Sequence, residues 1–176
     1  MILVLTGPVH SGKTTLLRKL LPELEDLGLP ASGYLSLLAM KEGQIVGYNL
    51  FDIRRRQSIP FLRTDGEACW EKVGGYFFLP RGLEAATAAI LGSKPGEIII
   101  VDEVGPTELA GRGVWPALHE MLSWPSFDCL LVVRRPLLDD LRNRLGDRPA
   151  KMFDVEREGV RSSLIAALSE LRAARP

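Results

Sequence analysis

The 176-residue sequence has only two cysteines, no long apolar run and no excess of charge of either sign. Cys69 and Cys129 are far apart and lack a C-x-x-C partner, which predicts free thiols in a reducing compartment. No stretch approaches the ~18 apolar residues that a membrane helix needs. The apolar N-terminus has no basic region ahead of it, which is unlike a signal peptide. We therefore expect a cytoplasmic protein with no membrane contact.

The absence of net charge also bears on possible partners. Lys plus Arg and Asp plus Glu each total 22, so no global field attracts the protein to nucleic acid. Nucleic-acid binding would need a local basic patch, and the run at 54–56 is more typical of a solvated turn. No segment of the sequence indicates which protein partner the chain would bind. The hydrophobic content of 46% is that of a globular protein, and the length predicts a single domain over residues 1–176.

Strand and helix patterns alternate along the chain. Residues 1–6 are a continuous apolar run typical of a strand buried on both faces, and leucines at helical spacing follow up to Gly28. Pro22 should kink that helix or end its regular part, because proline has no N–H to donate. Further strands are expected at 76–79, 97–105, 128–134 and 150–155, and helices at 67–73, 83–91, 115–122, 137–145 and 157–172.

Residues 33–63 have a different pattern. YLSLLAM and IVGYNLFDI are joined by KEGQ, which predicts two antiparallel strands and a turn, and IPFL follows as a third short strand. The whole chain therefore predicts an α/β fold with a mostly parallel central sheet, helices on both faces, and an antiparallel β-hairpin excursion near residues 33–63.

The segment GPVHSGKT directly follows the first expected strand and fits G-x-x-x-x-G-K-[ST], the pattern of a phosphate-binding loop. Gly7 permits the tight exit from the strand, and Gly12 lets the backbone approach a phosphate at the N-terminus of the next helix. Lys13 would contact the β- and γ-phosphates. We expect the nucleotide to be bound by Gly7, Pro8, Val9, His10, Ser11, Gly12, Lys13, Thr14 and Thr15.

A second motif, IIIVDEVG, places two carboxylates at the end of an apolar strand, where ligands bind in open α/β sheets. Asp102 suits a Mg²⁺ site together with the Thr14 hydroxyl, because Mg²⁺ prefers one or two carboxylates plus phosphate oxygens. Glu103 could accept a proton from a water that attacks the γ-phosphate. DEVG also fits the D-x-x-G of GTPases, but no N-K-x-D follows, which disfavours strict GTP specificity.

Two arginines lie at the end of the strand expected at 128–134. Arg134 or Arg135 could stabilise charge on the γ-phosphate, as an arginine finger does in other enzymes. The later arginines at 142–148 alternate with aspartates and indicate a solvated helix face.

Three functions fit these residues. The first is Mg²⁺-dependent hydrolysis of ATP or another nucleoside triphosphate, with Lys13, Glu103 and one of the two arginines as catalytic groups. The second is a small-molecule or nucleotide kinase that uses the same phosphate loop. The third is a nucleotide-binding regulatory module with little turnover. The acidic residue directly after Asp102 favours hydrolysis, since it is placed to activate water.

The order of the segments resembles the THEP-type nucleoside-triphosphatases, a P-loop NTPase family with a three-layer, RecA-like core. GPVHSGKTT, VGYNLFDI, VGGYFFL and IIIVDEVGPTEL carry the resemblance. It implies slow hydrolysis of ATP, GTP and other nucleoside triphosphates with Mg²⁺, with Lys13 and Thr14 at the phosphate and metal positions and Asp102 and Glu103 as the acid pair. The chain departs from the family pattern at Gly75, where a lysine is usual, and at Pro106 and Thr107, where a Lys-Met pair is usual.

Overall fold

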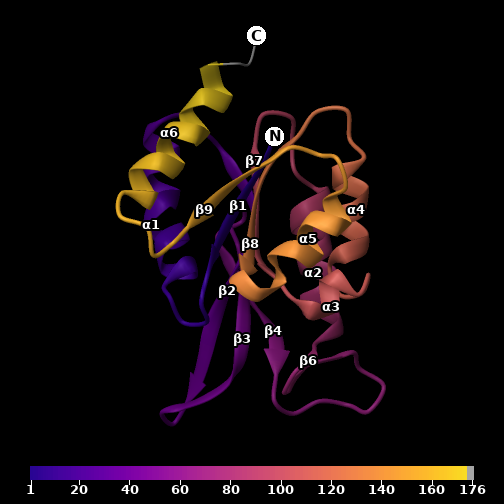
Figure 1. The fold of residues 1–176 in the computed structure, drawn as a ribbon. Coiled ribbons are helices and arrows are strands. Elements are labelled where there is room, and N and C mark those ends of the chain that lie inside the picture. The colour runs from indigo at the N-terminus through magenta and orange to yellow at the C-terminus, as the bar shows by residue number, and fades with distance from the viewer. Residues whose placement is uncertain (174–176) are drawn as a thin grey trace.

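In the computed structural model, which describes residues 1–173, nine strands form one sheet in the order β5-β6-β4-β3-β2-β7-β8-β1-β9 (Figure 1). The strands are β1 Ile2–Gly7, β2 Ala31–Lys41, β3 Gln44–Asp52, β4 Gln57–Arg63, β5 Lys72–Val73, β6 Tyr76–Phe78, β7 Ile98–Val104, β8 Asp128–Arg134 and β9 Ala150–Asp154. The helices are α1 Lys13–Asp26, α2 Pro80–Leu91, α3 Pro106–Leu109, α4 Trp115–Leu122, α5 Leu138–Leu145 and α6 Val160–Ala173, with a 3₁₀ turn at Arg135–Leu137.

The strands β2, β7, β8, β1 and β9 are parallel neighbours and form the part of the sheet that is covered on both faces. Every residue of β1 is buried, as expected for a parallel strand between two helical layers. Alternate residues face opposite layers, so that Leu3 and Leu5 belong to one core cluster and Ile2 and Val4 to the other.

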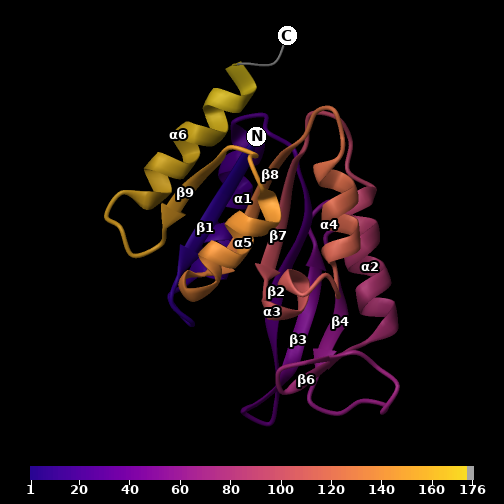
Figure 2. The ribbon, with the colours of Figure 1, turned by 45° about the vertical axis from the view of Figure 1, so that its right-hand side comes forward.

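Two groups of helices cover this sheet. On one face, α1 and α6 pack together and contribute Leu17, Leu20 and Leu168 to the first core cluster. On the other face lie α2, α3, α4 and α5, and Figures 1 and 2 show this separation on either side of the strands. Helices on both faces of a central sheet give the three-layer α/β fold that the sequence predicts.

The antiparallel region is larger than the sequence indicates. β3, β4, β6 and β5 continue the same sheet beyond β2, so that four neighbouring pairs are antiparallel and four are parallel. The sheet is therefore mixed instead of mostly parallel. The reason is that β2 has two roles: residues 31–34 pair with β7, and residues 34–41 pair with β3.

Two local predictions need correction. α1 continues to Asp26, so Pro22 does not end the helix. Residues 67–73 do not form a helix, because Lys72 and Val73 pair with β6 around the Gly74–Gly75 turn. A two-residue Gly-Gly loop strongly favours a hairpin, and the seven preceding residues are too short to oppose it.

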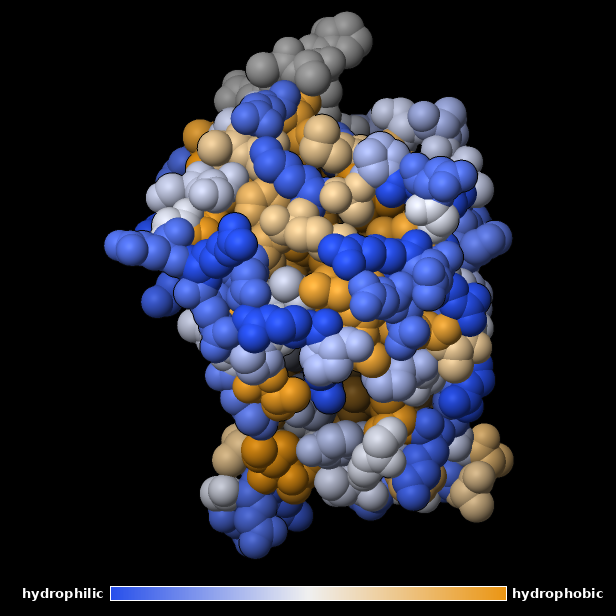
Figure 3. Space-filling model, viewed as in Figure 1, coloured by the Kyte–Doolittle hydropathy of each residue, from blue (hydrophilic) through white to orange (hydrophobic). Residues whose placement is uncertain are grey.

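The end of the β2–β3 hairpin projects beyond the helical layers and has an apolar surface. Leu38, Met40 and Ile45 are each more than two-fifths exposed, and Figure 3 shows apolar residues gathered on this lower projection. Elsewhere in the described chain, Cys69 is exposed and Cys129 is buried, and both are free thiols. Within residues 1–173, no helix is both long enough and apolar enough to span a bilayer.

Candidate active site

The phosphate loop begins where β1 ends, and its shape depends on Gly7. This residue has φ of 153°, and a Cβ there would lie 2.5 Å from Val155 Cγ1. The turn is then closed by the Ser11 hydroxyl, which donates to the Pro8 carbonyl at 2.8 Å. The loop leads into α1, whose first N–H groups have no partner inside the helix and can face an anion.

Lys13 lies within this loop and is only 7% exposed. Its ammonium donates to the Pro8 carbonyl at 2.5 Å and to the Gly7 carbonyl at 3.3 Å. Burial lowers the pKa of Lys13, while the nearby negative charge of Glu103 opposes that effect. The loop therefore surrounds a cation, as a site for the outer phosphates of a nucleotide requires.

The two residues expected at a metal site are in contact. The Thr14 hydroxyl donates to Asp102 Oδ2 at 2.8 Å, and the Ser36 N–H donates to the same oxygen at 3.2 Å. Asp102 is 2% exposed, and burial raises its pKa to about 6 in spite of these two hydrogen bonds. A hydroxyl and one carboxylate fit Mg²⁺ that is shared with phosphate oxygens, and residues 1–173 contain no cluster of three or more His, Cys, Asp or Glu that could hold a metal alone.

Glu103 lies beside Asp102 at an irregularity in β7. Val101 pairs with Leu131 and Val104 with Val133, so the two acidic residues occupy a bulge between these pairs. Bulges often redirect side chains next to active sites. Glu103 Oε1 lies 2.5 Å from Arg134 Nε, and both side chains are partly exposed.

The structure separates the two arginines that the sequence proposes for the γ-phosphate. Arg134 is paired with Gly7 across β8 and β1, and it lines the cavity above the phosphate loop. The Arg135 guanidinium instead donates to Asp154 at 2.7 Å and to Glu156 at 2.6 Å. Arg135 does not line that cavity, so the geometry supports only Arg134 as a γ-phosphate ligand.

The phosphate cavity, as we call this space, has a volume of about 360 Å³. Predicted residues that line it are Val9, His10, Ser11, Gly12, Lys13, Thr14, Thr15, Asp102, Glu103 and Arg134. Four further residues come from the β2–β3 hairpin: Ser36, Leu37, Leu38 and Tyr48. No sequence pattern marks these four residues as part of the cavity. Their position depends on the pairing of β2 with β7, which places the hairpin beside the phosphate loop.

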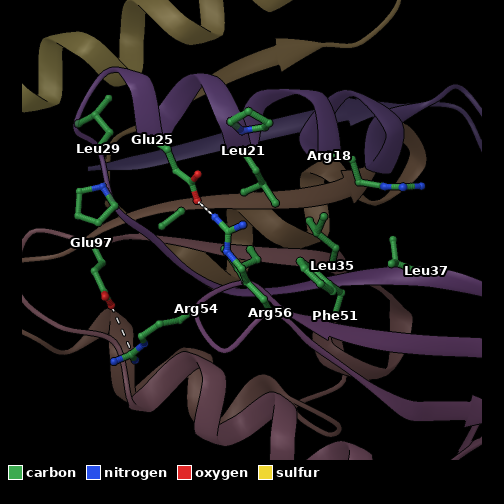
Figure 4. A pocket seen from close by; sticks show the side chains of 14 residues that line it. Arg18, Leu21, Glu25, Leu29, Leu35, Leu37, Phe51, Arg54, Arg56 and Glu97 are labelled. Carbon is green, nitrogen blue, oxygen red and sulfur yellow. Dashed lines mark hydrogen bonds and ion pairs between the residues drawn. The ribbon is translucent and has the colours of Figure 1, made fainter.

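A separate cavity of about 470 Å³ lies between α1 and the β2–β3 strands (Figure 4). Its floor is apolar and includes Leu35 and Phe51, and an ion pair between Arg56 and Glu25 spans it. At another side of this cavity, Glu97 Oε2 lies 3.8 Å from Arg54 Nη2. Each arginine of the basic run at 54–56 thus pairs with a carboxylate of the same chain.

Comparisons with known proteins agree with this geometry. Residues 2–166 match the family described as NTPase. The chain is 30% identical to the cancer-related nucleoside-triphosphatase homolog of Mus musculus, over 92% of this chain and 90% of that one. It is 31% identical to nucleoside-triphosphatase THEP1 of Archaeoglobus fulgidus, over 81% and 84% of the two chains. The solution structure of a human cancer-related nucleoside triphosphatase has a TM-score of 0.77 at 25% identity and covers 99% of both chains. The predicted resemblance to THEP-type enzymes is therefore confirmed, and the chain belongs to the NTPase family.

Proposed function

We propose that this chain hydrolyses nucleoside triphosphates to the diphosphate and phosphate in a Mg²⁺-dependent reaction at the phosphate cavity. The observation that carries the proposal is the contact of Thr14 with Asp102, which joins the phosphate loop to the acidic strand across 88 positions of sequence. Family membership supports the hydrolytic activity. We also propose that residues 1–176 act as one domain, since the nine strands share one sheet.

In this proposal the backbone N–H groups of the loop bind the β- and γ-phosphates, and the Lys13 ammonium neutralises their charge. Thr14 and Asp102 would hold Mg²⁺ together with phosphate oxygens, and the ion would supply further neutralisation of the triphosphate. Arg134 extends from the neighbouring strand toward the same charge. Catalysis at such sites consists mainly of positioning and electrostatic stabilisation.

The nucleophile in hydrolysis is a water molecule held by Glu103. The carboxylate accepts a proton from this water as its oxygen attacks the γ-phosphorus, and the bond between that phosphorus and the bridging oxygen breaks to release the diphosphate. The ion pair with Arg134 limits the rotation of Glu103. Asp102 is the one Asp or Asn among the described residues that line the cavity, and we assign it to the metal ion, which agrees with the use of several nucleotides.

The test is phosphate release from ATP, GTP, CTP and UTP with and without Mg²⁺. Wild-type protein is expected to release phosphate only with Mg²⁺. Glu103→Gln should lower kcat by about 100-fold or more, because general-base catalysis contributes roughly 10² to 10⁴ in rate. Lys13→Ala should lower both kcat and nucleotide affinity, since Lys13 contacts the phosphates in every step.

Arg142→Ala is the matched control for Arg134→Ala. Arg142 is exposed, pairs with Asp139 and lies outside the phosphate cavity. Its replacement should leave the rate unchanged, whereas Arg134→Ala should lower it. A folded Lys13→Ala protein that hydrolyses ATP at the wild-type rate would refute the proposed site, and tight ATP binding without turnover by wild type would identify a regulatory module instead.

A further inference from the structure

A second cavity, of about 340 Å³, lies next to the phosphate cavity and has a different lining. Five aromatic rings surround it, and we call it the aromatic cavity: Tyr34, Tyr48, Phe61, Tyr76 and Phe78. The rings of Tyr48 and Tyr76 meet edge to face with centroids 5.4 Å apart. Phe61 meets Tyr34 edge to face at 5.6 Å and Phe78 in a tilted arrangement at 5.3 Å. The volume and the aromatic walls are those of a small-molecule site.

The two cavities share a wall. Ser36, Tyr48, Glu103 and Arg134 line both of them, so the ion pair of Glu103 with Arg134 stands at the boundary. A compound in the aromatic cavity would therefore lie within reach of the group that we propose as the general base. No side chain of the phosphate loop itself lines the aromatic cavity.

The position of Glu103 decides which molecule the aromatic cavity can take. In phosphoryl transfer the attacking and leaving oxygens lie roughly in line on opposite sides of the γ-phosphorus. Glu103 marks the side of the attacking oxygen, so the diphosphate and its nucleoside leave in the opposite direction. The aromatic cavity on the Glu103 side is thus placed for a second molecule and not for the base of the nucleotide being cleaved.

The charges of the aromatic cavity favour a neutral compound. Its one arginine is paired with Glu103, and Gly75, Pro106 and Thr107 contribute no charge where they line it. Glu108 is 4% exposed and accepts the Gly105 N–H at 2.9 Å, so an added anion would meet a buried carboxyl group. Tyr34, Phe61 and Phe78 are buried in the core, whereas Tyr48 and Tyr76 are partly exposed. Contact with these two tyrosine rings favours a planar ring system, as in base recognition by aromatic side chains.

We propose that the aromatic cavity binds a free nucleoside or a similar neutral ring compound with a hydroxyl group, and that this hydroxyl replaces water as the acceptor of the γ-phosphate. The hydroxyl oxygen forms a bond to the γ-phosphorus as the bond to the bridging oxygen breaks. The hydroxyl proton passes to Glu103, and the products are the phosphorylated nucleoside and the nucleoside diphosphate. This inference rests on the proposed function, because both reactions use the same phosphate cavity.

The experiment follows the label from γ-³²P-ATP with Mg²⁺ and, in separate reactions, adenosine, guanosine, cytidine, uridine or thymidine at about 1 mM, the upper range of ordinary KM values. Labelled nucleoside phosphate is separated from labelled inorganic phosphate. At least one nucleoside is expected to carry label and to lower phosphate release. Gly75→Trp should reduce the ratio of the two products by about tenfold, since an indole there would fill the cavity.

Gly75 suits this substitution because a Cβ added there has no atom within 4 Å. Lys19→Trp, on the exposed side of α1, is the matched control and should keep the wild-type product ratio. Tyr76→Ala offers a second variant that should lower the same ratio by removing one ring. If the protein releases inorganic phosphate but transfers label to none of the five nucleosides, this proposal alone is overturned. If the protein releases no phosphate from ATP when nucleosides are absent, the proposed function is overturned.

Discussion

At the scale of single residues, Asp102 shows how a buried carboxylate can be kept at a site. It is almost fully buried, and the Thr14 hydroxyl and Ser36 N–H donate to the same oxygen. These bonds do not fully offset the loss of hydration, because the pKa of Asp102 in the folded protein is about 6, above the usual 3.8. The ionised side chain, which the proposed Mg²⁺ site requires, therefore lowers the stability of the fold.

The sign of this effect gives a prediction. The folded protein binds the Asp102 proton more tightly than the unfolded chain, so the contribution of this group to stability is most unfavourable above pH 6 and disappears as the pH falls below 4. Asp102→Asn should therefore raise the free energy of unfolding at pH 8, by about 3 kcal/mol at most. The difference in unfolding free energy between this variant and wild type is measured by urea unfolding at pH 4 and pH 8, in EDTA and without nucleotide.

Asp26→Asn is the control for that substitution, since Asp26 is an exposed aspartate at the end of α1. Its unfolding free energy should match wild type within about 0.5 kcal/mol. Equal stability of Asp102→Asn and wild type at pH 8 would show that ionised Asp102 does not destabilise the fold.

At the scale of an element, α1 shows that packing can override a local signal. Pro22 cannot donate to the Arg18 carbonyl, yet the helix continues to Asp26 and the Leu27 N–H still donates to the Glu23 carbonyl at 3.0 Å. The buried leucines on both sides of Pro22 hold the helix against the sheet. Helical periodicity predicted the contact face correctly. Of the two effects expected of Pro22, a kink or an end of the regular helix, the structure excludes the end.

Pro22→Ala should stabilise the protein. Pro22 is exposed, so its replacement removes little packing and restores one helical hydrogen bond. The helix gains about 3 kcal/mol from propensity, and the more flexible unfolded chain offsets up to about 1 kcal/mol of this. Urea unfolding should show an increase of about 2 kcal/mol. Lys19→Ala on the same exposed surface should change little, and a less stable Pro22→Ala protein would contradict this account.

At the scale of the whole molecule, the parallel and antiparallel halves of the sheet join at β2. Gly33 lies at this junction, opposite Ile100 of β7, with φ of 84°. A Cβ at Gly33 would lie 2.0 Å from the Ile100 carbonyl oxygen. The junction brings the β2–β3 hairpin beside the phosphate loop and thereby encloses both cavities.

Gly33→Ala should therefore lower the free energy of unfolding by more than about 3 kcal/mol, because the strand must move away from β7. Gly43→Ala is a matched control, since Gly43 has φ of 80° but open space around its Cβ position. The control should lose only about 1 to 2 kcal/mol, the cost of the left-handed conformation. Thermal or urea unfolding of both variants separates the cost of the steric contact from the cost of the backbone conformation. Equal losses of unfolding free energy in the two variants would contradict the proposed clash.

The sequence by itself determined the local chemistry of this protein. Apart from β5 and α3, the order of strands and helices follows from short-range patterns of apolar, glycine and charged residues. The loop through Thr14 and the acidic pair at Asp102 and Glu103 follow from the same kind of pattern. Only the tertiary structure decided that β2 joins two sheet types, that Arg134 and not Arg135 faces the loop, and that Tyr48 lies between two cavities. These outcomes depend on pairing between strands distant in sequence, and no local pattern encodes which strands become neighbours.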